Sequence, residues 1–263
     1  MKKQSTLFFV ALQFYTRFPI PGWVSYSADS LSRATRFLPL IGWLVGLICG
    51  AVWLAGDHLL NMEIGLLMSM IFSVITTGAF HEDGFADVCD GFGGGWTKEK
   101  ILMIMKDSRL GTYGVAGLVF MLSIKFLSLK YLGELANADF FILTLTLVSG
   151  HALSRMMAVT VIFTQPYARD SDDSKAKPVA TATKKSTFVV ASILAMVPFL
   201  GLIYFLKQPE LLLSLLFLYI ITVLMSRYFY KWIGGYTGDC LGAVQQVSEV
   251  SFYLFVAILW KFI

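Results

Sequence analysis

Long apolar runs separated by short polar segments dominate the pattern of the chain. Seven runs approach the length of about 20 residues that a helix needs to cross a bilayer, and they lie at 37–56, 62–80, 112–132, 139–163, 187–206, 210–230 and 241–260. The runs are continuous and do not alternate with polar residues, which excludes a transmembrane β-barrel. The pattern predicts an all-α fold, a polytopic membrane helix bundle with about seven transmembrane helices.

The segment 5–20 has a different pattern. It is too short to span a membrane and is interrupted by Gln13 and Arg17, so we expect an N-terminal helix that lies in the membrane interface. No small-residue cleavage site precedes Arg17 and Pro19, which argues against a cleaved signal peptide. Since no internal repeat is visible, residues 1–263 are expected to form a single membrane-embedded domain.

Composition supports a membrane protein. The 263 residues are 57% hydrophobic and 14% charged, whereas soluble chains have roughly 45–50% apolar and about 25% charged residues. A net charge of +4 spread over such a chain gives little reason to expect a nucleic-acid partner; membrane lipid is the expected surrounding. The three cysteines form no CxxC pair, and their spacing predicts neither a disulfide framework nor a zinc site.

Basic residues fall mainly on one side of the predicted spans. The segments 1–36, 81–109, 164–186 and 227–239 contain 5, 4, 5 and 2 lysines and arginines, 16 together, against three on the other side. The positive-inside rule therefore places the N-terminus and the long polar loops in the cytoplasm. Polar groups gathered on one face indicate a site that works at the membrane surface.

Three carboxylates follow the second span directly. Asp83, Asp87 and Asp90 are spaced i, i+4, i+7, so on a helix they share one face. Two carboxylates about 6 Å apart repel by roughly 3 kcal/mol at an effective dielectric of 20, and no basic residue at helical spacing offsets this. Hard oxygen donors favour Mg²⁺ or Mn²⁺ over zinc. Glu82 is a further candidate ligand, and a solvated acidic turn is the simpler alternative.

Basic residues that could bind phosphate lie in two later segments. Lys106 and Arg109 could grip one phosphate together, although anchoring of the third span would also explain them. The polar loop 164–186 contains Lys175 and Lys177, which could close over an anionic substrate. Lys106, Arg109 and Lys177 are therefore candidate substrate-binding residues.

A second polar region leads into the last span. Asp239 follows Gly238, and a simple helix N-cap is the alternative to a metal-binding or catalytic role. Gly242, Gln245 and Glu249 continue a polar stripe into an apolar helix. A charge inside the membrane needs a partner or a role. The natural partners of Glu249 are two residues of the fourth span, His151 and Arg155.

Structural pairing inside the bundle is the default interpretation of His151, Arg155 and Glu249. His151, Arg155 and Gly238 are also retained as candidate substrate contacts. We expect the Asp239 carboxylate within roughly 10 Å of the three-carboxylate face, because the second span ends and the seventh begins on the same side of the membrane and the polar stripe should face the bundle interior.

Four motifs, in order along the chain, resemble the cobalamin synthase (adenosylcobinamide-GDP ribazoletransferase) family. They are HEDGFADVCDG at 81–91, MKDSRLGTYG at 105–114, SKAKPVA at 174–180 and GGYTGDCLGA at 234–243. The resemblance covers nearly the whole chain, beginning with RFLPLIGWLVG at 36–46. It implies a single catalytic domain in the bacterial cytoplasmic (inner) membrane, with the active site on the cytoplasmic side.

The resemblance also implies a reaction. Such an enzyme depends on Mg²⁺ and joins two small-molecule substrates, adenosylcobinamide-GDP and α-ribazole or its 5′-phosphate, with release of GMP. The residues that would hold Mg²⁺ are Glu82, Asp83, Asp87, Asp90 and Asp239. Lys106 and Arg109 would stabilise the phosphoryl charge, and Asp90 or Asp239 would take the proton of the attacking hydroxyl.

Two other functions remain open at this point. A Mg²⁺-dependent intramembrane prenyltransferase or CDP-alcohol-type phosphotransferase also uses aspartate-rich sites, but the second motif here has a single aspartate and the CDP-alcohol pattern is absent. A transporter would place ionisable residues at mid-membrane in symmetric halves, and no repeat is seen. The sequence leaves a homo-oligomer open.

Overall fold

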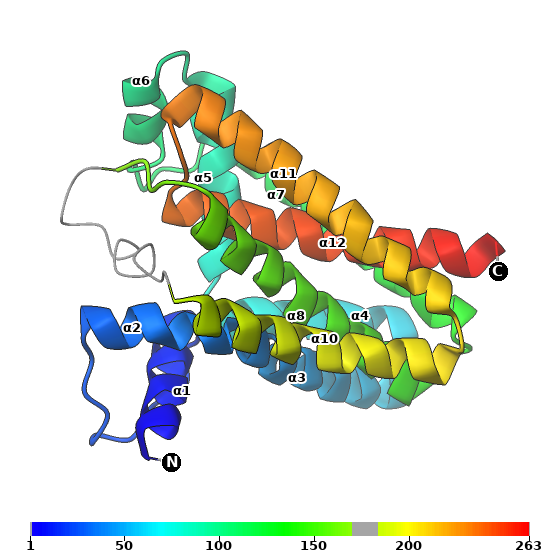
Figure 1. Ribbon diagram of the computed structural model, residues 1–263. Helices are drawn as coiled ribbons and strands as arrows, with labels where there is room; N and C mark the ends of the chain where they lie inside the picture. Colours follow the sequence, from blue (N-terminus) through cyan, green and yellow to red (C-terminus); the bar gives the residue numbers. More distant parts are fainter. Residues whose placement is uncertain (1, 170–183, 263) are drawn as a thin grey trace.

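The fold is a bundle of long helices with short helices gathered at one end (Figure 1). The computed structural model describes residues 2–169 and 184–262. The helices are α1 (Lys2–Tyr15), α2 (Ala28–Ala34), η1 (Thr35–Phe37), α3 (Leu38–Leu59), α4 (Met62–Thr77), α5 (Phe80–Gly94), α6 (Lys98–Ile104), α7 (Thr112–Leu135), α8 (Phe140–Thr164), α10 (Lys185–Leu206), η2 (Pro209–Leu212), α11 (Leu213–Ile233) and α12 (Gly238–Phe262). No strand forms in these residues, which confirms the predicted all-α class.

Six helices in the described part of the chain are long and apolar enough to cross a membrane. They are the continuous stretch Ala28–Leu59, which includes α3, together with α7, α8, α10, α11 and α12. The bounds of α3, α7, α8, α10, α11 and α12 agree with six of the predicted spans to within a few residues. The chain is therefore a multi-pass membrane protein, as the sequence predicted.

The predicted second span ends earlier than expected. The sequence predicted a continuous run over 62–80, but α4 stops at Thr77, and α5 leaves it at an angle of 89°. Gly78 and Ala79 cause the bend, because both adopt left-handed backbone angles, with φ of 66° and 58°. Such angles end a helix. Alone, α5 is not among the six spans, and it runs across the end of the bundle (Figure 1).

The N-terminal helix also crosses this end of the bundle. Figure 1 shows α1, α2, α5 and α6 together at one end, and the C-terminus at the other. The main chain of Arg17 donates a hydrogen bond to the carbonyl of Thr76 (2.8 Å), which ties the residues after α1 to the end of α4. α1 is not among the six spans, and its placement in the membrane interface stays a prediction.

The core is organised around α8, which is buried along almost its whole length and packs against α3, α10 and α12. The outer helices expose large apolar side chains instead, such as Phe120 and Leu127 of α7 and Leu224 of α11. Soluble monomers rarely expose apolar surface on this scale, whereas a lipid-facing surface requires it.

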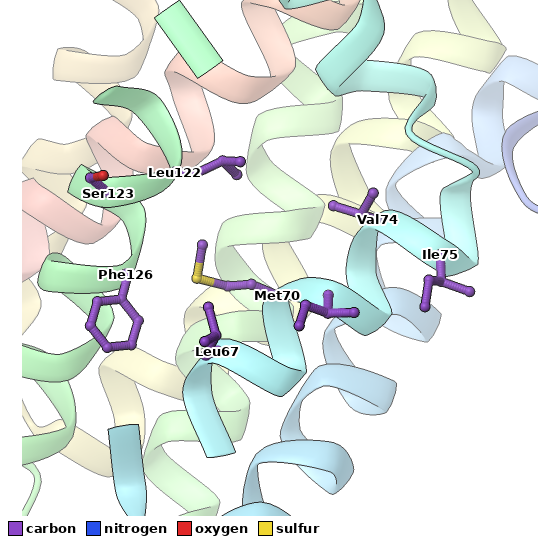
Figure 2. A pocket seen from close by; sticks show the side chains of 8 residues that line it. Leu67, Met70, Val74, Ile75, Leu122, Ser123 and Phe126 are labelled. Atoms are coloured by element: carbon purple, nitrogen blue, oxygen red, sulfur yellow. The ribbon is translucent and has the colours of Figure 1, made fainter. Parts of the chain in front are cut away.

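An apolar cavity of about 410 Å³ lies between α4 and α7. Figure 2 shows Leu67, Met70 and Val74 of α4 facing Leu122 and Phe126 of α7 across this space. No charged side chain lines it. The cavity therefore lacks the polar groups that fix a substrate in place, and the candidate chemistry lies elsewhere, at the end of the bundle.

Candidate active site

The predicted three-carboxylate face lies on α5, but its members have different surroundings. Asp83 is exposed, whereas Asp87 and Asp90 are half-buried. The helix begins directly after the bend at Ala79, which presents this face at the end of the bundle that carries the short helices. The prediction that one helix carries all three residues is confirmed.

The carboxylate of Asp90 accepts hydrogen bonds from the N-terminus of α7. Its two carboxylate oxygens accept hydrogen bonds from the main-chain N–H groups of Gly111 (2.7 Å) and Gly114 (2.8 Å). A Cβ at either glycine would lie within 2.5 Å of an Asp90 oxygen, which explains the spacing of the two glycines in the motif. Asp90 thus caps α7 from a neighbouring helix. Its predicted metal-binding and catalytic roles stay predictions.

Asp239 lies directly against α5. A Cβ built on Gly84 would be 2.9 Å from the Cα of Asp239, and a Cβ on Gly242 would be 3.0 Å from the carbonyl oxygen of His81. The two glycines therefore allow α5 and α12 to touch through their backbones. Since Gly84 lies between Asp83 and Asp87, the structure brings the two predicted halves of the site together, as the topology argument expected.

Asp239 is not the N-cap of α12. The hydroxyl of Thr237 accepts the main-chain N–H of Cys240 (3.3 Å), which is the contact that an N-cap makes. The Asp239 carboxylate accepts hydrogen bonds through Oδ2 from Arg169 (2.8 Å) and from Thr237 (3.2 Å). The capping alternative for Asp239 is therefore not what the structure shows.

A short pairing of two loops places Arg169 beside Asp239. The main chain of Ala168 donates to Tyr236 (2.9 Å), and that of Tyr236 donates to Pro166 (3.0 Å). Gly235, with a φ of 158°, makes this approach feasible, because a Cβ there would lie 2.1 Å from the Pro166 carbonyl oxygen. Gly235 therefore allows the two loops to approach each other closely.

The charged groups around Asp87 are mostly negative. Burial raises the pKa of its carboxyl to about 7, and the neighbouring Asp239 and Asp83 carboxylates contribute to the rise, while Arg169 acts in the opposite direction. A carboxylate in this position is costly to ionise without a cation. The site therefore favours a positively charged ligand.

The donor set fits a magnesium ion by its chemistry. Among the described residues, no group of three or more His, Cys, Asp or Glu side chains could hold a metal ion as arranged. Mg²⁺ does not require such a cage, because it is usually bound by one or two carboxylates, waters and substrate phosphates. Asp83, Asp87 and Asp239 supply suitable oxygen donors. Glu82 is instead buried, and it accepts a hydrogen bond from Gln246 (3.0 Å).

The predicted phosphate-binding residues Lys106 and Arg109 do not lie on one helix, and their joint binding of a phosphate stays a prediction. α6 ends at Ile104, so Lys106 and Arg109 do not share a helical face. Lys106 lines a surface cavity of about 340 Å³, whereas the exposed Arg109 pairs with Asp107 (2.6 Å). Lys175 and Lys177 lie outside the described residues.

Gly238 begins α12 and lines a small cavity of about 30 Å³. That space has about the volume that one water molecule takes up in the liquid. The predicted role of Gly238 in substrate binding stays a prediction.

The buried ionisable residues form a separate network inside the bundle. Glu249 on α12 pairs with Lys125 on α7 and with His151 on α8, the latter at 3.0 Å. Gln245 donates to Glu249 (2.6 Å), and Arg155 donates to the main-chain carbonyl of His151 (3.0 Å). All five side chains are buried. Pairing with Glu249 is confirmed for His151, whereas Arg155 bonds to His151 and forms no ion pair with Glu249 in the part of the chain that the structure describes. Substrate contacts of His151 and Arg155 stay predictions.

Comparisons with known proteins decide the family. The family model described as cobalamin-5-phosphate synthase matches residues 7–257. The chain belongs to the cobalamin-5-phosphate synthase family. A protein of Shewanella frigidimarina (strain NCIMB 400) is 44% identical over 254 residues, which cover 97% of this chain and 95% of the relative. A protein of Leptospira interrogans is 40% identical, covering 99% and 98%.

The proteins of Shewanella frigidimarina and Leptospira interrogans are both named adenosylcobinamide-GDP ribazoletransferase. A third protein with that name, from Shewanella pealeana, is 45% identical over 258 residues, with 98% of this chain and 97% of the relative covered. No solved structure matches the chain. These names describe an enzyme and favour neither a prenyltransferase nor a transporter.

Two basic residues near the site, Arg169 and Lys98, were not predicted from the sequence. Arg169 is 70 positions from its partner Asp239, and Lys98 lies on a short helix that no apolar periodicity marks. The sequence alone contains no signal for an ion pair between residues 70 positions apart, such as Arg169 and Asp239. The sequence does show the glycine at 235 and the aromatic residues at 167 and 236, which together form the loop pairing that positions Arg169.

Proposed function

We propose that the chain is an adenosylcobinamide-GDP ribazoletransferase. It joins adenosylcobinamide-GDP to α-ribazole or its 5′-phosphate, releases GMP and gives adenosylcobalamin or its phosphate. The family and the names of relatives that cover nearly the whole chain support this proposal. The observation that carries the site is the contact of α5, with Asp83 and Asp87, against Asp239 at the start of α12.

We propose that the enzyme depends on Mg²⁺, held by Asp83 and Asp87, with the Asp239 carboxylate beside them. When bound, the ion would neutralise the diphosphate and the departing phosphate of GMP. The excess of negative charge around Asp87 supports this assignment. Asp90 positions α5 on α7 through its two main-chain hydrogen bonds, and Glu82 positions α5 on α12 through Gln246.

Asp239 is the proposed general base that takes the proton of the attacking ribazole hydroxyl. Asp239 accepts both Arg169 and Thr237 through Oδ2, and no described residue donates a hydrogen bond to its Oδ1. Asp90, the other candidate, has both oxygens engaged by N–H donors. Hydrogen bonds to an ionised carboxylate lower its basicity, which favours Asp239 over Asp90.

We propose that the protein lies in the bacterial cytoplasmic (inner) membrane with this site facing the cytoplasm. The sequence supports the orientation, because 16 lysines and arginines belong to segments on one side and three to the other. The ends of α5 and α6 and the start of α12 lie at the same end of the bundle (Figure 1). Thiol labelling of the single-cysteine variants Lys100→Cys and Lys207→Cys in intact cells tests the orientation. Only the variant at position 207 should be labelled from outside.

The function is tested by following GMP release from the purified protein in detergent. Adenosylcobinamide-GDP and α-ribazole together, with Mg²⁺, should give GMP and a cobalamin product in equal amounts. Omitting α-ribazole or replacing Mg²⁺ with excess chelator should stop the release. A protein that releases no GMP with both substrates and Mg²⁺, or that releases it equally with chelator, would contradict the proposed activity or its metal dependence, respectively.

A further inference from the structure

A cationic cavity lies next to the carboxylate site. It has a volume of about 340 Å³, within the roughly 300–1,000 Å³ of small-molecule sites, and it is lined from α6 and from the segment after α8. Lys98, Lys106 and Arg169 line it against a single carboxylate, Glu99. The lining therefore carries a positive excess, in contrast to the carboxylate face beside it.

Arg169 joins the cavity to the carboxylate site. One of its terminal nitrogens, Nη2, donates to Asp239 (2.8 Å), and the side chain is 14% exposed. Its Nε is buried and has no hydrogen-bond partner among the described residues. A buried donor without an acceptor is costly, so the Nε of Arg169 would be stabilised by a ligand oxygen. The planar fork of arginine matches phosphate oxygens well.

Lys98 approaches the same loop from α6. Its Nζ lies 3.8 Å from the position of a Cβ at Gly234, the residue that ends α11 and leads into the loop with Tyr236. Lys98 and Lys106 are both exposed, and no described residue forms an ion pair with either. Both ammonium groups are therefore available to an anion in the cavity.

We propose that the cavity lined by Lys98, Lys106 and Arg169 binds the phosphate group of a nucleotide, and that this is the guanosine-side phosphate that leaves as GMP. The inference rests on the proposed function, which supplies a nucleotide substrate. The carboxylates would face the transferred phosphoryl group through the metal, while the cationic cavity receives the departing phosphate. Arg109, which is 88% exposed and paired with Asp107, has no part in it.

A second nucleotide phosphate offers the same chemistry, that of α-ribazole 5′-phosphate. An experiment can distinguish the phosphate of GMP from that of α-ribazole 5′-phosphate, because α-ribazole without its phosphate is also a substrate under the proposed function. Loss of a GMP site changes binding of GMP and the KM for adenosylcobinamide-GDP. Loss of a ribazole-phosphate site changes the KM for α-ribazole 5′-phosphate and leaves that for α-ribazole unchanged.

The test compares the double variant Lys98→Ala/Lys106→Ala with Lys100→Ala. Lys100 is an exposed lysine on α6, the helix that carries Lys98, and it does not line the cavity, so the control also removes a positive charge beside it. Direct binding of GMP to the purified full chain is measured by calorimetry at low salt. We expect binding to weaken about tenfold or more in the double variant, from the loss of charge-assisted hydrogen bonds, and to be unchanged in Lys100→Ala.

The outcomes distinguish the inference from the function on which it rests. If the wild type releases GMP from both substrates, and the double variant binds GMP and uses every substrate as the wild type does, the cavity is not a phosphate site and the proposed function stands. If only the KM for α-ribazole 5′-phosphate rises, the cavity binds the other nucleotide and our assignment to GMP is overturned. If the wild type releases no GMP, the proposed function itself fails.

Discussion

Acidic side chains occur in two regions of this bundle, and their partners differ. In the interior, Glu249 contacts Lys125, His151, Gln245 and Tyr253 and is fully buried. At the end of the bundle, Asp83, Asp87 and Asp239 have one basic partner in the described residues, Arg169. The protein itself therefore satisfies the interior carboxylate, whereas the group at the end of the bundle is left for a cationic ligand.

The largest effect is expected for Asp87→Asn. This change removes one proposed metal ligand and keeps the shape of the side chain, so turnover should fall by orders of magnitude while the protein stays folded in the membrane. GMP release and the thermal unfolding curve in detergent measure the two properties. Wild-type turnover of the variant at low Mg²⁺ would remove Asp87 from the metal site.

Glu249→Gln should have the opposite pattern, a large loss of stability. It leaves Lys125 buried without its carboxylate, and breaking a buried ion pair costs about 3–5 kcal/mol. Thermal unfolding in detergent checks this. The double variant Lys125→Met/Glu249→Leu, which removes both charges, should recover part of the loss. Equal stability of Glu249→Gln and the wild type would show that the interior network is not a stabilising element.

Asp239→Ser tests whether the contact between α5 and α12 makes one site. Because Thr237 already caps α12, the change should not disturb the helix, and activity should fall at least about a hundredfold if Asp239 is a ligand or base. GMP release measures it, with circular dichroism as the folding control. Retention of most activity would separate Asp239 from the carboxylate face.

Gly84→Ala should weaken the same contact by steric means. The new methyl group would lie 2.9 Å from the Cα of Asp239, and overpacking of this kind typically costs about 1–3 kcal/mol. Gly22→Ala is the control, since nothing lies within 4 Å of a Cβ there. We expect lower thermal stability and lower activity only in Gly84→Ala; matching curves for the two variants would argue against close helix packing at this point.

The smallest effect is expected for Arg109→Ala. Arg109 is exposed and, within residues 2–169 and 184–262, forms an ion pair with Asp107 alone, whose pKa it lowers to about 2 by donating hydrogen bonds. Removing such a surface group should leave kcat/KM within about threefold of the wild type. A loss of a hundredfold or more would identify Arg109 as a phosphate ligand and contradict its exclusion from the site.

Much of the fold could be predicted because a membrane imposes a strong pattern. The apolar runs located six spans, and the stripe of Gln245 and Glu249 correctly indicated a buried face of α12. The early end of the second span was missed, because hydropathy continues past Thr77 and the bend depends on left-handed angles at Gly78 and Ala79. Of these two, only the glycine gives a signal in the sequence.

The candidate site was predicted in its acidic half and less well in its basic half. Helical spacing identified the face of Asp83 and Asp87, because those residues share one helix. Helical spacing does not apply to Lys106 and Arg109, since α6 ends before either residue, and their role in phosphate binding stays a prediction. Arg169 was not found, because its position beside Asp239 depends on two loops that meet only in the folded bundle.

The central claim is that the carboxylates of α5 bind the metal ion. Its most direct test uses Mn²⁺ as a substitute for Mg²⁺, because electron paramagnetic resonance detects the binding of Mn²⁺. The purified wild-type chain, with GMP present, should bind Mn²⁺. Asp87→Asn should lose this binding, while Arg109→Ala keeps it. If Asp87→Asn binds Mn²⁺ with wild-type affinity and stoichiometry, the unpaired carboxylates of α5 are not the metal site, and the difference between the two acidic regions has another cause.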